Sequence, residues 1–213
     1  RWIANAGFTK PVVFCLGNHE SYRHTIDHDL EKARAEAAKY PNIHLLQNNT
    51  VDIGGVRFIG ATLWTSYTLM REDQQWAAMR CADQSMNDHR LIRIAEKGYR
   101  RFRPEDALTE HMVSVIYIEE MLSKPFEGPR VVISHHSPSI RSCHDRFWGD
   151  LLNAAYHSHL DHLVDRCQIW VHGHIHHATR YKRGDGEVVC NPRGYEALGE
   201  KSGWDPLLVV EVG

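Results

Sequence analysis

The stretch Ile169-Trp170-Val171-His172-Gly173-His174-Ile175-His176-His177 joins a short apolar run to a loop that is rich in histidine. The apolar part has the length and β-branched content of a buried strand, and the glycine marks its end. Proteins use histidine sparingly, so histidines that follow a strand indicate a metal site. His174 and His176 are two positions apart on an extended segment, and we expect their side chains to share a face.

Two other segments repeat this pattern of a buried strand followed by polar residues. Val12–Leu16 precedes Gly17-Asn18-His19-Glu20, and Val131–Ile133 precedes Ser134-His135-His136. In open α/β sheets, the loops beyond the carboxyl ends of neighbouring strands converge. We therefore expect the three polar loops to surround one metal centre. Imidazole and carboxamide ligands suit zinc, manganese or iron.

The remaining pattern predicts an α/β fold. Strands are expected at Ile43–Leu46, Val51–Ile53, Val56–Ile59, Val188–Cys190 and Leu207–Val212. Gly54-Gly55 between two of these strands is a hairpin signal. Asp27 is expected to cap a helix that continues to about residue 39, and Pro104 to begin a long helix that ends near Leu122. We interpret residues 62–103, which are dense in charge, as a mostly helical insertion over one end of the sheet.

Composition narrows the class of protein. A chain of 213 residues fits a single domain over residues 1–213, and its net charge of −2 gives no sign of a nucleic-acid or membrane surface. No apolar stretch approaches 18 residues, so no transmembrane helix is expected. The five cysteines are scattered without a C-x-x-C pair, which favours reduced thiols and a cytoplasmic location.

Gly17-Asn18-His19-Glu20, His135 and Gly173-His174-Ile175-His176 resemble, in this order, motifs of the calcineurin-like metallophosphoesterase family. The resemblance covers residues 11–193 and extends to small bacterial members of the group. It implies a four-layer α/β/β/α sandwich, here without its N-terminal strands. It also implies hydrolysis of a phosphate mono- or diester by a hydroxide that bridges two divalent ions (Mn, Fe or Zn).

The resemblance also implies roles for individual residues. Asn18, His135 and His174 would ligate one metal ion and His176 the other. His19 would lie beside the metals and protonate the leaving oxygen or stabilise the phosphoryl group. His135 is taken as the ligand because it follows the strand most directly, although a shift of one residue would exchange it with His136.

Substrate contacts are expected beyond the metal ligands. His136 is one candidate. Arg193, after a later strand, could contact a phosphate oxygen or form an exposed salt bridge. Asn87-Asp88-His89 in the insertion could form part of a substrate rim. The partner is expected to be a phosphorylated small molecule or another phosphoester. The sequence does not select the substrate, the metal or the oligomeric state.

Two motifs of the family do not occur in this sequence. They are D-x-H and G-D-x-x-D, which supply an Asp and a His to one metal and the Asp that bridges both. In the family they precede the helix whose end we expect at residues 1–7, so we expect them upstream of Arg1. Residues 1–213 alone would then bind one metal weakly and have little activity. The alternatives are a non-catalytic metal-binding or scaffold module of the same fold, and a mononuclear zinc hydrolase.

Overall fold

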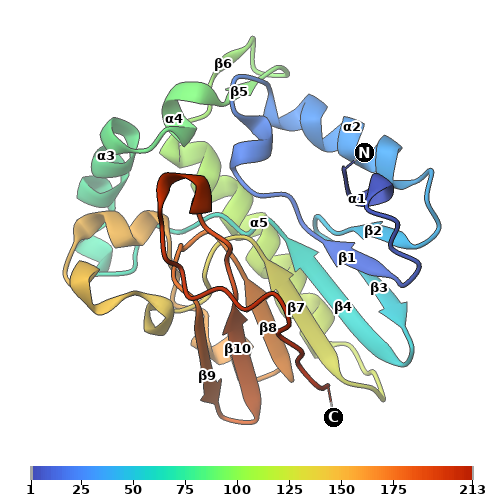
Figure 1. Ribbon diagram of the computed structural model, residues 1–213. Coiled ribbons are helices and arrows are strands. Elements are labelled where there is room, and N and C mark those ends of the chain that lie inside the picture. The colour runs from blue at the N-terminus through green and yellow to red at the C-terminus, as the bar shows by residue number, and fades with distance from the viewer. Residues whose placement is uncertain (1, 213) are drawn as a thin grey trace.

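A six-stranded sheet forms the centre of the protein, whose computed structural model describes residues 2–212 (Figure 1). In spatial order its strands are β3 (Asn49–Ile53), β4 (Val56–Ala61), β7 (Arg130–Ser134), β8 (Ile169–His172), β10 (Gly186–Cys190) and β9 (Thr179–Arg183). The four inner strands are parallel, and the edge strands β3 and β9 are antiparallel to their neighbours. All the polar loops that follow the parallel strands therefore lie at one end of the sheet.

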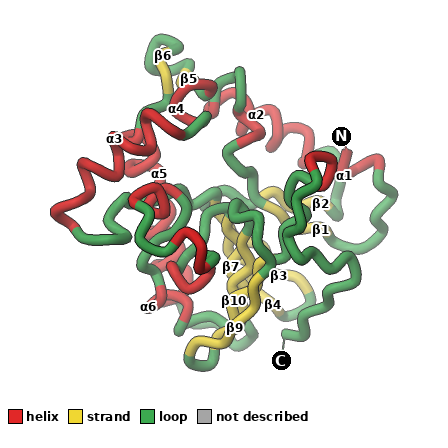
Figure 2. The backbone as a smooth tube through the Cα atoms, turned by 60° about the vertical axis from the view of Figure 1, so that its left-hand side comes forward, coloured by secondary structure: helices red, strands yellow, loops and turns green. Residues whose placement is uncertain are grey.

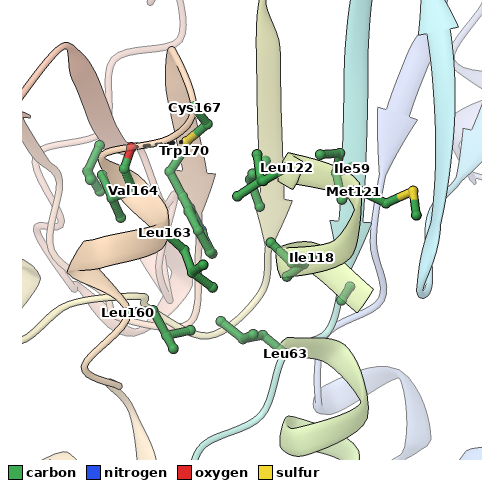
Figure 3. Close-up of a cluster of buried hydrophobic side chains, with 13 residues drawn as sticks. Ile59, Leu63, Ile118, Met121, Leu122, Leu160, Leu163, Val164, Cys167 and Trp170 are labelled. Carbon is green, nitrogen blue, oxygen red and sulfur yellow. Dashed lines mark hydrogen bonds between the residues drawn. The ribbon is translucent and has the colours of Figure 1, made fainter. Parts of the chain in front are cut away.

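Helices cover one face of this sheet. The long helix α5 (Pro104–Ser123) and the short helix α6 (Asp161–Val164) pack on it. The cluster between them contains Ile59, Val132, Trp170 and Val188 from four strands, each fully buried, together with Ile118, Met121, Leu122, Leu163 and Val164 from the two helices (Figure 3). Apolar burial on this scale is the main stabilising term of the fold.

The opposite face carries a second apolar cluster. Val131, Ile169 and Val189 form its buried part, and the C-terminal segment packs against it through Leu208, Val210 and Val212. Exposure alternates along Leu207–Val212, because Leu207 and Val209 point outward. The prediction of a strand there is wrong, because the segment pairs with no neighbouring strand. The strand β9 was not predicted, since its sequence Thr-Arg-Tyr-Lys-Arg is largely polar.

A small parallel sheet lies on this second side, formed by β1 (Val12–Phe14) and β2 (Ile43–Leu45). Leu46, directly after β2, contacts Gly60 of β4, where any larger residue would collide with it. Helix α2 (Ile26–Ala37) packs against β2, and α1 (Trp2–Asn5) precedes β1. Figure 2 shows α5 and α6 on one side of the central sheet and β1 and β2 on the other. The predicted α/β architecture is thus confirmed.

Residues 62–103 form a layer of their own above the strand ends (Figure 1). They contain α3 (Gln75–Ser85), α4 (Asp88–Leu91) and the two-residue strands β5 (Arg93–Ile94) and β6 (Arg100–Arg101). The prediction of a mostly helical insertion is therefore only partly right. Leu63, Trp64 and Tyr67 have positive φ angles, which a right-handed helix cannot contain. A separate apolar cluster that includes Trp64, Met79 and Ile92 holds this layer together.

Several local predictions can be compared directly with the structure. The Gly54-Gly55 hairpin is confirmed, with φ angles of 58° and 80°, and Pro104 does begin α5. Asp27 is not the N-cap of α2, because Thr25 occupies that position. The Asp27 carboxylate instead accepts hydrogen bonds from the backbone of Ala95 and Glu96 in the insertion. All five cysteines are free.

Short 3-10 helices complete the fold: η1 (His19–Ser21), η2 (Glu72–Gln74), η3 (Ile140–Ser142), η4 (Asp145–Phe147), η5 (Leu151–Ala155) and η6 (Glu196–Leu198). Four of them, η3 to η6, follow β7 or β10, so the loops at the carboxyl ends of these strands are ordered by local hydrogen bonds. Across residues 2–212, no helix has both the length and the apolar character needed to cross a membrane.

Candidate functional site

Three loops that are far apart in the sequence meet at the carboxyl end of the sheet. Asn18 follows β1, His135 follows β7 and His174 follows β8. The Oδ1 atom of Asn18 lies 2.8 Å from Nε2 of His135, and this nitrogen lies 3.1 Å from Nδ1 of His174. The predicted convergence of these three side chains is therefore present in the structure.

The spacing of these atoms fits a metal shell. Ligand atoms at right angles on a metal with bonds of about 2.1 Å are about 3.0 Å apart. The two measured separations lie on either side of this value. Across residues 2–212, no three side chains of His, Cys, Asp or Glu surround a single point, so a three-residue shell here requires the Asn18 amide.

Backbone geometry brings the two histidine rings together. A Cβ atom at Gly17 would lie 2.6 Å from Cε1 of His135, so only glycine lets this ring occupy its place. His174 has a φ angle of 65°, a left-handed conformation that costs roughly 1–2 kcal/mol for a residue other than glycine. The Gly173 amide donates a hydrogen bond to the His135 carbonyl and ties the two loops to each other.

Burial favours the neutral form of His135 and His174. Loss of solvent around the rings lowers the pKa of His135 and of His174 well below 6.5, and the neighbouring His136 lowers both further. A neutral imidazole offers a lone pair to a metal ion, whereas a protonated one does not. The Nε2 atom of His174 is buried and has no hydrogen-bond partner among the residues that the structure describes.

The amide of Asn18 is held from the other side by the insertion. Its Nδ2 atom donates a 2.7 Å hydrogen bond to Oδ1 of Asp88, in α4, and Tyr22 donates a second 2.7 Å bond to the same oxygen. Asn18 and Asp88 are each 2% exposed. Sequence reasoning considered Asp88 only as part of a substrate rim. No local signal could have connected it with Asn18, because 70 positions separate the two residues.

His19 and His176 lie at the border of the site. The Tyr195 hydroxyl is 3.3 Å from both ring nitrogens of His19, which is exposed. Nδ1 of His176 lies 2.9 Å from a carboxylate oxygen of Glu200. The pKa of Glu200 is lowered, first by a hydrogen bond from the Tyr195 amide and also by His176, so Glu200 carries its negative charge beside the imidazole.

A cavity of about 1070 Å³ joins these groups. Five of the residues predicted for the site line it, namely Asn18, His19, His135, His174 and His176. Other parts of its wall are apolar or basic, including Met86, Phe147, Tyr156, Arg146 and Lys201. The volume exceeds what a phosphate group alone would fill, and it can hold a ligand of the size of a typical small metabolite.

Two of the predicted substrate contacts, His136 and Arg193, lie outside the lining of this cavity, whereas Asn87 lines it. His136 is 1% exposed, packs against the Trp64 ring and has its Nδ1 atom 3.1 Å from the Thr62 carbonyl. Arg193 donates two hydrogen bonds to one carboxylate oxygen of Glu196. Their roles in substrate binding stay predictions.

Comparison with known proteins agrees with this arrangement. Residues 1–178 match the model of the calcineurin-like phosphoesterase family, and the chain belongs to that family. It is 22% identical over 215 residues to an uncharacterized protein of Acanthamoeba polyphaga mimivirus, covering 94% of this chain and 73% of that one. Phosphopantetheinyl hydrolase from Mycobacterium tuberculosis has a similar structure, with a TM-score of 0.65 and 13% identity over 98% of this chain and 81% of that chain.

A second solved structure matches with a TM-score of 0.50 and 16% identity, covering 88% of this chain and 58% of the other. At such identities the structural likeness establishes the shared fold. Phosphoesterase activity as a class follows from membership of the family, which also generally uses divalent metals.

Proposed function

We propose that this protein is a metal-dependent hydrolase of a phosphate mono- or diester. The observation that supports this most directly is the contact between Asn18, His135 and His174, whose Oδ1, Nε2 and Nδ1 atoms are separated by 2.8 and 3.1 Å. Three uncharged ligands that meet at the wall of a large cavity suit a divalent ion that also contacts a substrate.

These three residues would hold one divalent ion, and His176 would contribute to a second. Manganese, iron and zinc all accept imidazole and amide ligands. When bound, such ions activate water near neutral pH and neutralise charge on the phosphate oxygens. Glu200, beside Nδ1 of His176, would fix the orientation and tautomer of this imidazole, as acidic partners of metal-binding histidines commonly do.

His19 would act on the leaving group. It is exposed at the cavity wall and lies between the Tyr22 and Tyr195 rings, with centroid separations of 4.4 and 6.0 Å. In this position it could donate a proton to the departing oxygen or stabilise the phosphoryl group. Arg193 would have to exchange Glu196 for a phosphate oxygen in order to bind substrate. His136, beneath the cavity wall, would act through its contact with the His174 ring, 4.2 Å away.

Two measurements test this proposal. Titration calorimetry of residues 1–213 with Mn²⁺ and Zn²⁺ should detect one ion bound per chain, and EDTA should remove it. Hydrolysis of p-nitrophenyl phosphate and its bis ester should be weak for this chain and should depend on metal in a polypeptide that also carries D-x-H and G-D-x-x-D. Metal binding with no hydrolysis by the longer polypeptide would favour the scaffold function. The absence of metal binding would overturn the proposed site.

A further inference from the structure

The carboxylate of Asp88 lies directly behind the Asn18 amide, on the side away from the histidines. Asp88 belongs to α4 of the insertion, whereas Asn18 follows β1. The 2.7 Å bonds from Nδ2 of Asn18 and from the Tyr22 hydroxyl both end on Oδ1 of Asp88. With both Asn18 and Asp88 only 2% exposed, water cannot easily replace either bond.

This contact determines which end of the amide faces the cavity. A carboxamide can rotate by half a turn and exchange its oxygen for its nitrogen, and only the oxygen can ligate a metal ion. An ionised carboxylate accepts hydrogen bonds and cannot donate them. It therefore pairs only with the nitrogen end of Asn18, and Oδ1 must point towards His135, from which it lies 2.8 Å.

The same contact changes the electronic character of the ligand. A hydrogen bond from an amide N–H to a charged acceptor is stronger than one to a neutral acceptor. It draws the amide towards its polar resonance form and increases the negative charge on Oδ1. Carboxylates that hydrogen-bond to metal-binding histidines raise ligand basicity in a comparable way.

We propose that Asp88 is a positioning residue, which holds Asn18 with its oxygen towards a metal ion and makes the insertion a part of the metal site. The proposal rests on the proposed metal shell of Asn18, His135 and His174. In consequence, residues 62–103 do more than cover one end of the sheet, because they supply a buried charge on which metal affinity depends.

The test compares Asp88→Ala and Asp88→Asn with the unmodified chain. Calorimetry with Mn²⁺ should show affinity reduced about 10- to 100-fold for Asp88→Ala, the usual effect of losing such a partner. Asp88→Asn keeps an acceptor oxygen but removes the charge, so its loss should be smaller. It also preserves the size of the side chain, which keeps the test valid if Asp88→Ala does not fold.

Nuclear magnetic resonance of the metal-free chain gives an independent measurement. The side-chain amide protons of Asn18 should appear downfield and exchange slowly with water in the unmodified chain. Asp88→Ala should abolish both properties. These resonances report whether Asp88 holds the Asn18 amide, and the Mn²⁺ affinity separates positioning from a merely structural role, which would change thermal stability and leave that affinity unchanged.

Asp106→Asn is the matched control. Asp106 is also a buried carboxylate, 7% exposed, and it binds Lys97 and Arg100 at the start of α5. Its substitution should lower the melting temperature without altering the Mn²⁺ dissociation constant. If the unmodified chain binds Mn²⁺ and Asp88→Ala binds it within twofold as tightly, the positioning role is wrong and the metal site stands. If the unmodified chain binds no ion, both proposals fail.

Discussion

Nε2 of His135 lies 3.1 Å from Nδ1 of His174, although 39 positions separate the two residues in the sequence. Strands β7 and β8 are parallel neighbours, with Ile133 paired to Val171, so the loops that follow them leave the sheet side by side. The left-handed backbone of His174 then turns its ring towards His135. The adjacent histidine, His136, is buried with its Nδ1 atom 3.1 Å from the Thr62 carbonyl, and its ring packs against the His174 ring at a centroid distance of 4.2 Å.

Removal of the His135 imidazole should abolish metal-dependent stabilisation of the chain. At a free Mn²⁺ concentration about 100 times the dissociation constant, binding should stabilise the unmodified chain by about 2.7 kcal/mol. We expect His135→Ala to show none of this increase in a thermal melt with and without Mn²⁺. His162→Ala is the control, because His162 is exposed on α6. An equal Mn²⁺-dependent shift in His135→Ala and the unmodified chain would contradict the assignment of this ligand.

Gly17→Ala should weaken metal binding without removing any ligand. The new Cβ atom would lie 2.6 Å from Cε1 and 2.7 Å from Nδ1 of His135, so the ring must move. We expect a loss of about 10- to 100-fold in Mn²⁺ affinity, comparable with the loss of a supporting contact. Gly173→Ala provides the comparison, because its Cβ would remain 3.7 Å from His135 Nδ1, an ordinary contact. Calorimetry should show a clearly smaller loss of Mn²⁺ affinity for Gly173→Ala. An equal loss in the two variants would argue against the steric explanation.

The free energy of unfolding should fall as the pH is lowered below about 6.5. Burial lowers the pKa of His111, and it lowers the pKa of His157 to about 3. The unfolded chain takes up protons below about pH 6.5 while these native rings stay neutral, so acid favours unfolding. Between the ordinary pKa of about 6.5 and its native value of about 3, His157 should contribute a slope of about 1.4 kcal/mol per pH unit to the free energy of unfolding, and His111 a slope of the same sign.

Urea unfolding at pH 7, 6 and 5 measures this slope. His111→Gln removes one titrating group, and its side-chain amide can still donate a hydrogen bond to the Leu63 carbonyl that His111 contacts at 3.1 Å. Its slope should be shallower than that of the unmodified chain, because one group with a lowered native pKa is removed. His162→Gln, at an exposed position, should retain the full slope. Identical slopes for the unmodified chain and His111→Gln would show that His111 is not neutral in the folded protein.

Ser134 and Trp170 should be energetically coupled. The indole Nε1 of Trp170 donates a 2.8 Å hydrogen bond to Oγ of Ser134, and both residues are buried. Ser134→Ala should cost about 1–3 kcal/mol, because it leaves the buried indole N–H without an acceptor. In a Trp170→Phe background the same substitution should cost about 1 kcal/mol less. Denaturant unfolding of the two single variants and the double variant gives the coupling, and additivity within about 0.3 kcal/mol would contradict it.

Much of the candidate site could be predicted from local sequence. Each of the three polar loops directly follows an apolar run, and the rule that loops converge at the carboxyl ends of parallel strands then brings His135 and His174 together. Asn18 follows β1 of the separate two-stranded sheet, whose position the rule does not give. The Gly54-Gly55 hairpin and the start of α5 at Pro104 were predictable from single residues. Both depend on backbone preferences of the residues themselves, φ above zero for glycine and a fixed φ for proline.

The tertiary structure alone determined the features that depend on contacts between distant segments. Leu207–Val212 has the alternation of a strand but pairs with no other strand, since pairing depends on which neighbour is within reach. The choice between His135 and His136 as the ring that faces Asn18 depends on the turn after β7. The contact between Asp88 and Asn18 joins the insertion to the end of a strand. A sequence records the chemistry of each residue, whereas packing of the whole chain decides which residues become neighbours.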